Sequence, residues 1–250
     1  MKSRLRILLT LSVLIFAVTA CDFPRLVSRE TPAPADKTPV NVSEDLTPFT
    51  EIDIEAAGPI FLVQGDNHSI QIDGPKSIVE SISYEVRNGV LLIRHSRSIW
   101  DRITDRDYPT ITITFEDLTR FVFEGGSELV ANDLQTDSLS ISMKGGASLD
   151  MMNLNVRSLE MVVEGGTDID ISGIAEIQTL DFSGGTNFDA EDLRSASISL
   201  HIEGAVSATV WATETLDLDL SGAYDVKYYG NPSLTQDIQG VGNVQGLGEK

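Results

Sequence analysis

The chain contains few of the residues that disulfide-stabilised folds and most catalytic sites require. Its 250 residues include one cysteine, three histidines and 6% aromatic residues. A single cysteine excludes an intramolecular disulfide, so the fold must be stabilised by its packed core. The histidines, His68, His95 and His201, are widely separated and belong to no recognisable catalytic motif.

Basic residues are also scarce, with 18 Lys and Arg against 38 Asp and Glu. The first 20 residues hold three basic residues and no acidic ones, so the remainder has a net charge of 15 − 38 = −23. Such a chain is repelled by the phosphates of nucleic acid and by anionic membrane surfaces. We therefore expect no nucleic-acid partner.

Residues 1–20 are typical of a bacterial export signal. Lys2, Arg4 and Arg6 precede an apolar run, residues 7–17, which is too short to remain as a membrane span. The segment Val18-Thr19-Ala20-Cys21 resembles a lipobox, in which the signal is cleaved before the cysteine and lipid is attached to it. We predict lipidation of Cys21, and hence a membrane-anchored lipoprotein on the outer side of the cytoplasmic membrane or in the cell envelope. The alternative is an ordinary signal peptide that ends near a cysteine.

Residues 21–47 are predicted to form a disordered tether. Pro24, Pro32, Pro34 and Pro39 lie among small and polar residues, and no periodic apolar face is present. An N-terminal strand is the alternative, which so many prolines disfavour.

A glycine corner recurs seven times at intervals of 18 to 20 residues, which is typical of a repeat architecture. The corners are Gly125-Gly126, Gly145-Gly146, Gly165-Gly166, Gly184-Gly185, Gly204-Ala205, Gly222-Ala223 and Gly240 with Gly242. We expect the first glycine of each corner to adopt positive φ or to lie where a Cβ does not fit.

Apolar residues occupy equivalent positions in every repeat and alternate with polar ones, which indicates strands with one buried face. We predict an all-β fold, a right-handed parallel β-helix with about 18–20 residues per turn, whose equivalent side chains are stacked. An antiparallel sandwich with glycine-rich hairpins is the alternative, but it does not explain the columns. The column two residues before the first glycine is Phe123, Met143, Val163, Phe182, Ile202, Leu220 and Ile238.

We predict a single β-helix domain over residues 48–250, with regular turns over 119–246. Its N-terminal part, residues 48–118, contains a strong hairpin signal, Asn88-Gly89 between two alternating segments. This hairpin is expected to cap the first turn, whose open edge would otherwise be exposed. The arginine-rich segment 94–106 interrupts the strand pattern, and its role is not predicted.

The alternating segment Phe49–Ile54, the Asn88-Gly89 hairpin, the strand Pro109–Thr114 and the glycine corners resemble the auto-transporter adhesin head domains called GIN domains. The resemblance covers residues 48–246. It implies an exported bacterial β-helix, often on a lipoprotein, with an adhesive or binding role and no catalytic residues. This chain differs in the charged residues that precede several corners, where serine is commoner: Glu124, Lys144, Glu164 and Glu203.

Carboxylates form the first candidate site. Asp150, Asp170 and Asp189 lie at equivalent positions in adjacent repeats, and Glu128 and Asp168 form a neighbouring column. Hard oxygen ligands suit Ca²⁺, so we consider a calcium-binding face. The alternative is a solvated acidic face whose repulsion is screened by salt.

Aromatic side chains form the second candidate. Trp211 and Tyr229 lie at equivalent positions in consecutive repeats, and two exposed rings one turn apart can stack on a sugar. The alternative is that they pack beneath the C-terminal residues. His201 is expected to face outward between Asp181 and Asp219.

The sequence favours a lipid-anchored, extracytoplasmic, non-catalytic binding or adhesion module for an unidentified envelope or extracellular ligand, either a glycan or a protein. One alternative is a polysaccharide-active β-helix enzyme, but turns of 18 to 20 residues leave no room for the long loops that wall such sites. Another is a self-assembling structural protein, because the glycine-rich residues 240–248 cap the last turn poorly and leave a homo-oligomer open.

Overall fold

The computed structural model describes residues 36–95 and 108–250, and residues 35–250 form one compact unit. The predicted signal peptide, Cys21 and the predicted tether up to residue 35 lie outside the described residues. The same holds for residues 96–107, which include most of the arginine-rich segment.

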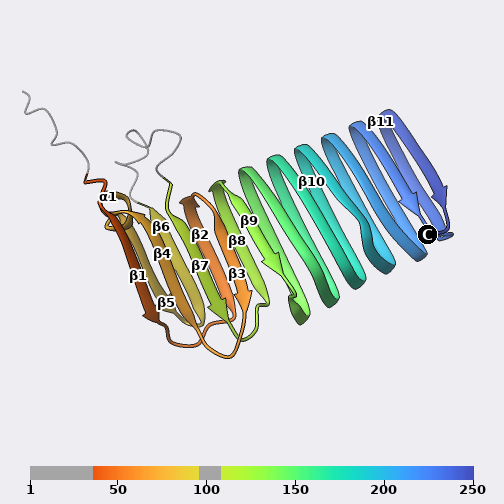
Figure 1. Cartoon of the computed structure of the whole chain (residues 1–250). Coiled ribbons are helices and arrows are strands. Elements are labelled where there is room, and N and C mark those ends of the chain that lie inside the picture. The colour runs from red at the N-terminus through yellow and green to blue at the C-terminus, as the bar shows by residue number, and fades with distance from the viewer. Residues whose placement is uncertain (1–35, 96–107) are drawn as a thin grey trace, which may run out of the picture. The chain divides into compact units, whose positions relative to one another are not determined.

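The described chain is all-β, as predicted, and its strands form one mixed sheet (Figure 1). The only helix in this part of the chain is the single turn α1 (Lys76–Val79), so no described helix is long enough to span a membrane. The strands are β1 (Pro39–Asp45), β2 (Glu51–Ala57), β3 (Ile60–Gln64), β4 (Ser69–Pro75), β5 (Ile82–Arg87), β6 (Val90–His95), β7 (Thr110–Phe115), β8 (Arg120–Gly126), β9 (Glu128–Asn132), β10 (Gln135–Tyr229) and β11 (Ser233–Gly248).

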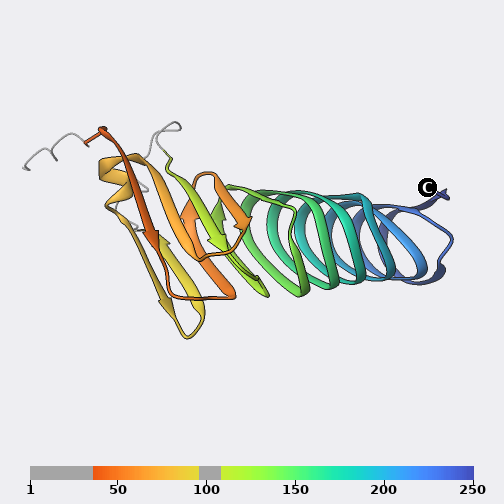
Figure 2. The same cartoon turned by 60° about the horizontal axis from the view of Figure 1, so that its bottom comes forward.

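Strand β10 is a continuous extended segment of 95 residues that winds through successive coils (Figure 2). At its beginning it pairs in parallel with β8, so that Met143 lies opposite Phe123. At its end it pairs in parallel with β11, so that Leu220 lies opposite Ile238. These registers correspond to the repeat of 20 residues at the beginning and 18 at the end.

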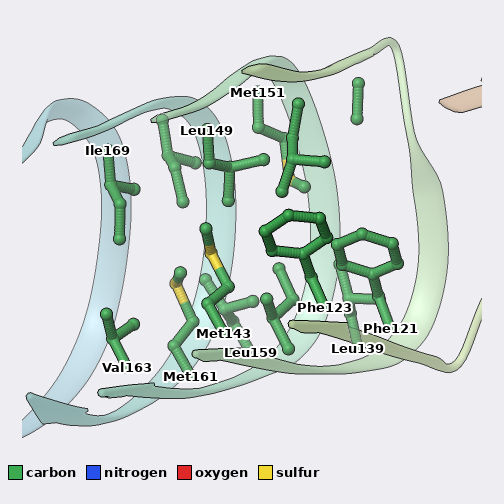
Figure 3. Packing of buried hydrophobic residues seen from close by; sticks show 14 of the residues in the cluster. Phe121, Phe123, Leu139, Met143, Leu149, Met151, Leu159, Met161, Val163 and Ile169 are labelled. Atoms are coloured by element: carbon green, nitrogen blue, oxygen red, sulfur yellow. The ribbon is translucent and has the colours of Figure 1, made fainter. Parts of the chain in front are cut away.

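The predicted apolar columns form the core between the walls of the coils. Phe123, Met143 and Val163 come from consecutive repeats, all are fully buried, and their side chains point toward Leu149 and Ile169 on the opposite wall (Figure 3). The column fails at its last member, because Ile238 is 40% exposed. It lies on β11, the last strand of the described chain, and no further coil covers it.

The corner glycines have two reasons to be glycine. Those at 125, 145, 165, 184, 204, 222 and 240 all adopt positive φ, as predicted. In addition, a Cβ at Gly165 would lie 2.2 Å from the carbonyl oxygen of Gly145, and one at Gly145 would lie 2.3 Å from that of Gly125. Consecutive coils therefore approach each other at this corner more closely than any side chain permits.

The N-terminal hairpin is confirmed, since β5 and β6 pair antiparallel and Asn88 and Gly89 both have positive φ. The strands around it are not stacked in chain order, however. Strands β2 and β3 pair in parallel with β6 and β7 on one side and with β8 and β9 on the other. The chain thus adds four strands, β4 to β7, outside β2 and β3 before it returns to build the regular coils.

The predicted disordered tether is wrong at its C-terminal end, because residues 39–45 form strand β1, paired antiparallel with β4. Pro39 is the first residue of this strand, where the missing N–H is tolerated. Val40 and Val42 are partly buried against the core, and the burial of these side chains explains the order. The alternation of Val40 and Val42 was the sequence signal, which the prolines obscured.

The hydroxyl of Tyr84 on β5 donates a hydrogen bond of 2.7 Å to Oε2 of Glu44 on β1. This bond joins the two strands that stand at opposite ends of the sheet's pairing order. Burial and the neighbouring Glu44 raise the pKa of Tyr84 to about 12. The hydroxyl therefore remains a hydrogen-bond donor at physiological pH.

Gly165→Ala should lower the free energy of unfolding by about 2–4 kcal/mol, because it combines strained φ with a backbone overlap. Gly166→Ala is the matched control, since a Cβ there meets no atom within 4 Å. Denaturant unfolding followed by circular dichroism measures both variants. Equal stability of the two would contradict close packing at the corner.

Candidate binding surface

The coils place the predicted aspartate column on one exposed face. Asp150, Asp170 and Asp189 are exposed residues of consecutive repeats of β10. The pKa of Asp170 is raised above its ordinary value, first by partial burial and then by the charges of Asp189 and Asp150. The column therefore brings like charges together.

The second predicted column is arranged differently. Asp168 accepts a hydrogen bond of 2.7 Å from Nδ2 of Asn187 in the next repeat. Glu128 is exposed at the beginning of β9 and lies in register with Ser148. Within residues 36–95 and 108–250, no three His, Cys, Asp or Glu side chains form a group that could hold a metal ion. Calcium binding stays a prediction.

The two predicted aromatic residues lie beneath the side chain of Lys250. Its Nζ is 4.9 Å from the ring centroid of Tyr229 and 5.7 Å from that of Trp211, both within cation–π range. The alternative expectation, that residues near the end of the chain pack over these rings, therefore describes the structure. A sugar would have to displace Lys250.

Lys250 also reaches the preceding repeat. Its Nζ donates hydrogen bonds of 2.6 Å to Oδ1 of Asp192 and 2.7 Å to the carbonyl oxygen of Glu191. Burial lowers the pKa of Lys250, but the hydrogen bond to Asp192 and the charges of Asp192 and Glu191 outweigh it, so the pKa is raised. The ammonium group therefore stays charged at neutral pH.

Two other tyrosines of β10 lie against β11, Tyr224 buried and Tyr228 partly buried. A Cβ at Gly242 would lie 2.5 Å from the ring of Tyr224, and one at Gly246 would lie 3.0 Å from the ring of Tyr228. Glycines in β11 thus leave room for rings from the preceding coil.

His201 is outward-facing, as predicted, with 38% of its side chain exposed. Its Nδ1 lies 3.2 Å from Oδ2 of Asp219 in the next repeat, and its Nε2 lies 3.7 Å from Oε1 of Glu203. Charge attraction contributes here only when the ring is protonated.

Several polar contacts join residues about one repeat apart, and the sequence reasoning missed them. Lys144 and Glu164 form an ion pair of 3.1 Å, and Nε of Arg157 donates a hydrogen bond of 2.8 Å to Asp137. Each of these pairs spans 20 residues. A search for opposite charges at the repeat interval would have found them, including the pair at the unusual charged positions before the corners.

His95 lies near a hydroxyl nucleophile, but its geometry does not favour catalysis. Its Nε2 lies 2.9 Å from Oγ of Ser81, but that hydroxyl donates to the carbonyl oxygen of Ile78. The serine proton is therefore directed away from the ring that would have to remove it. Burial lowers the pKa of His95 and keeps the ring neutral.

Together, the coils, the glycine corners and the exposed columns define an all-β repeat protein that presents stacked side chains to solvent. Residues 48–232 match the family described as "Putative auto-transporter adhesin, head GIN domain". The chain belongs to this family, as the resemblance indicated.

Solved structures support the same fold. A protein from Bacteroides fragilis described as a putative adhesin is 27% identical with a TM-score of 0.78, covering 84% of this chain and 98% of its own. A putative lipid binding protein from Parabacteroides distasonis is 16% identical with a TM-score of 0.67, covering 85% and 98%. A putative adhesin from Parabacteroides merdae is 16% identical with a TM-score of 0.63 and the same coverage. At 16% identity the last two show the fold alone. No curated protein matches the chain.

Asp170→Asn should raise the melting temperature at pH 7. The raised pKa means that the folded state holds a proton on Asp170 more readily than the unfolded state, so the carboxylate opposes folding at neutral pH. This cost disappears as the pH falls below 3.8, the ordinary pKa of an aspartate side chain. The variant and the wild type should then have the same melting temperature. Calorimetry between pH 3 and pH 7 measures the difference.

Asp137→Asn is the matched control, because a hydrogen bond from Arg157 lowers the pKa of Asp137. This substitution should therefore lower the melting temperature at pH 7. The same melts with millimolar Ca²⁺ address the cation hypothesis. A wild-type midpoint that does not move with calcium would contradict a calcium site in the aspartate column.

Proposed function

We propose that this protein is an exported, lipid-anchored, non-catalytic binding or adhesion module whose folded part is a right-handed parallel β-helix. The observation that supports it most strongly is the stack of corner glycines in a chain that belongs to an adhesin head family. Such a stack builds a rigid column of repeats with side chains displayed along its faces.

The parallel registers favour the β-helix. Strand β10 pairs in parallel with β8 and β9 at one end and with β11 at the other. Antiparallel pairs involve only the N-terminal strands β1, β4, β5, β6 and β7 among the described residues. They resemble a cap on a repetitive body.

The anchoring proposal depends on the first residues of the chain. Cys21 is the only cysteine in 250 residues, and it stands directly after the small residues that a lipobox requires. The described fold begins at β1, so residues 22–38 separate the cysteine from the first strand. This length suits a spacer between a membrane anchor and a folded head.

Binding is favoured over catalysis by the kind of surface that the repeats present. The 27% identical relative is described as a putative adhesin, and the exposed columns hold carboxylates and amides at regular spacing. Regular arrays of this kind suit recognition of an extended ligand, either a glycan or a protein. A polysaccharide-active enzyme needs instead an acid and a base at one defined position.

Self-assembly is a second candidate, favoured by the exposed end of β11. Leu234, Ile238, Val241 and Leu247 are exposed there, and Asp237 is the only charged residue of the strand. An unpaired edge with so little charge is a ready template for pairing with another strand. A second copy of this chain would complete it.

Cys21→Ala should abolish the lipid anchor. When the full chain is expressed in a bacterium and labelled with an alkyne fatty acid, we expect label on the wild type and none on the variant. The wild type should fractionate with membranes and the variant with the soluble extracytoplasmic material. A wild type that carries no label would contradict lipidation.

Purified protein should leave a panel of polysaccharides uncleaved, as measured by the appearance of reducing ends or unsaturated products. The same panel immobilised as an array should be used for binding. Cleavage of any member would contradict the non-catalytic assignment.

A further inference from the structure

The surroundings of the Lys250 ammonium group have the features of a ligand site. Four residues surround Nζ, and we call them the ammonium box: Glu191, Asp192, Trp211 and Tyr229. Nζ contacts both carboxyl-bearing residues and lies within cation–π range of both rings. Only 26% of the lysine side chain is exposed.

The box is a product of the repeat. Glu191, Trp211 and Tyr229 each stand seven residues after a corner glycine, at 184, 204 and 222. The coils therefore place these residues in one column, with Asp192 beside it. The cation lies against this column, where two rings and two acidic residues are held by strands rather than by a flexible loop.

Lys250 can leave the box without disturbing the core. Strand β11 ends at Gly248, whose carbonyl oxygen accepts a hydrogen bond of 2.9 Å from the backbone N–H of Gly230. Only Glu249 separates that anchored glycine from Lys250. Displacing the lysine would thus leave the pairing of β11 with β10 intact.

The contacts select a primary ammonium group. Two of them are N–H hydrogen bonds of 2.6 and 2.7 Å, which a quaternary ammonium group cannot make. An ethanolamine phospholipid fits less well, because its phosphate follows the ammonium by two carbons and would lie near Glu191 and Asp192. A lysine side chain has a four-carbon apolar stem and brings no anion.

We propose that the ammonium box binds a lysine side chain on an extended segment of a partner protein, with Lys250 as its resident occupant. The proposal rests on the binding role above and names one class of partner for it. The net charge of −23 outside the signal favours basic partners in the same way, by steering them toward the surface. A partner lysine competes with Lys250 for the same four residues.

The test uses the full chain carrying Lys250→Ala, which empties the box. Trp100→Phe makes Trp211 the only tryptophan, so that its fluorescence reports on the box. The probe is the peptide acetyl-Gly-Leu-Gly-Glu-Lys-amide, and its control carries norleucine in place of lysine. We expect saturable binding of the lysine peptide to Lys250→Ala, several-fold weaker binding to the chain that retains Lys250, and no saturation with the norleucine peptide.

Asp192→Asn in the Lys250→Ala background should lower the affinity for the lysine peptide roughly tenfold, because a charge-assisted hydrogen bond is lost. Lys250→Gln serves as a second emptied variant, and melting curves show that each variant is folded. If a folded variant without Lys250 shows no saturable binding of the lysine peptide, the proposal is overturned. Equal binding of the norleucine peptide, or binding of phosphatidylethanolamine vesicles in preference to the peptide, would also overturn it.

These outcomes are separate from those of the anchoring and cleavage experiments. The peptide assay measures purified protein and does not depend on lipid at Cys21 or on any polysaccharide. If the lysine peptide does not bind, a lysine-bearing partner is excluded, but the general binding role is not contradicted.

Discussion

The close approach of the backbone at the corner glycines is the constraint on which the rest of the structure depends. At Gly145, Gly165, Gly184, Gly204, Gly222 and Gly240, a Cβ would lie 2.2–2.4 Å from the carbonyl oxygen of the preceding corner glycine. Each corner is thus positioned by the one before it. This repeated contact keeps the strands in register and lets side chains of the same position accumulate in columns, inside and outside.

The columns have opposite consequences on the two faces. Inside, stacked Phe, Met, Leu, Ile and Val side chains are removed from water, which supplies the favourable free energy of the fold. Outside, stacking brings like charges together, and the charges of Asp189 and Asp150 add to the effect of partial burial in raising the pKa of Asp170. Opposite charges one repeat apart offset part of this cost, and Lys144 with Glu164 and Arg157 with Asp137 are examples. A face of columns is therefore also an electrostatic pattern.

The N-terminal strands and the C-terminal strand β11 bound the stack of coils in different ways. At the N-terminal end, β1 and β5 are joined by the hydrogen bond from Tyr84 to Glu44, and antiparallel pairing replaces the repeat. At the other end, β11 keeps the parallel register but has no strand on its outer side in the described chain. Tyr224 and Tyr228 cover its glycines, and Lys250 returns along the surface to the ammonium box. The exposed apolar residues and the box both belong to this end.

The sequence by itself determined the all-β class, the hairpin at Asn88-Gly89, the positive φ of the corner glycines and the inward position of Phe123, Met143 and Val163. These features are local or strictly periodic, so that residue type and spacing are sufficient to predict them. Only the tertiary structure decided that β6 and β7 lie outside β2 and β3, and that residues 39–45 form a strand. Both depend on pairing between segments distant in the chain, and the short alternation of Val40 and Val42 does not decide that pairing by itself. The same reason applies to Lys250: its seat over Trp211 and Tyr229 follows from the path of β11 along the preceding coil.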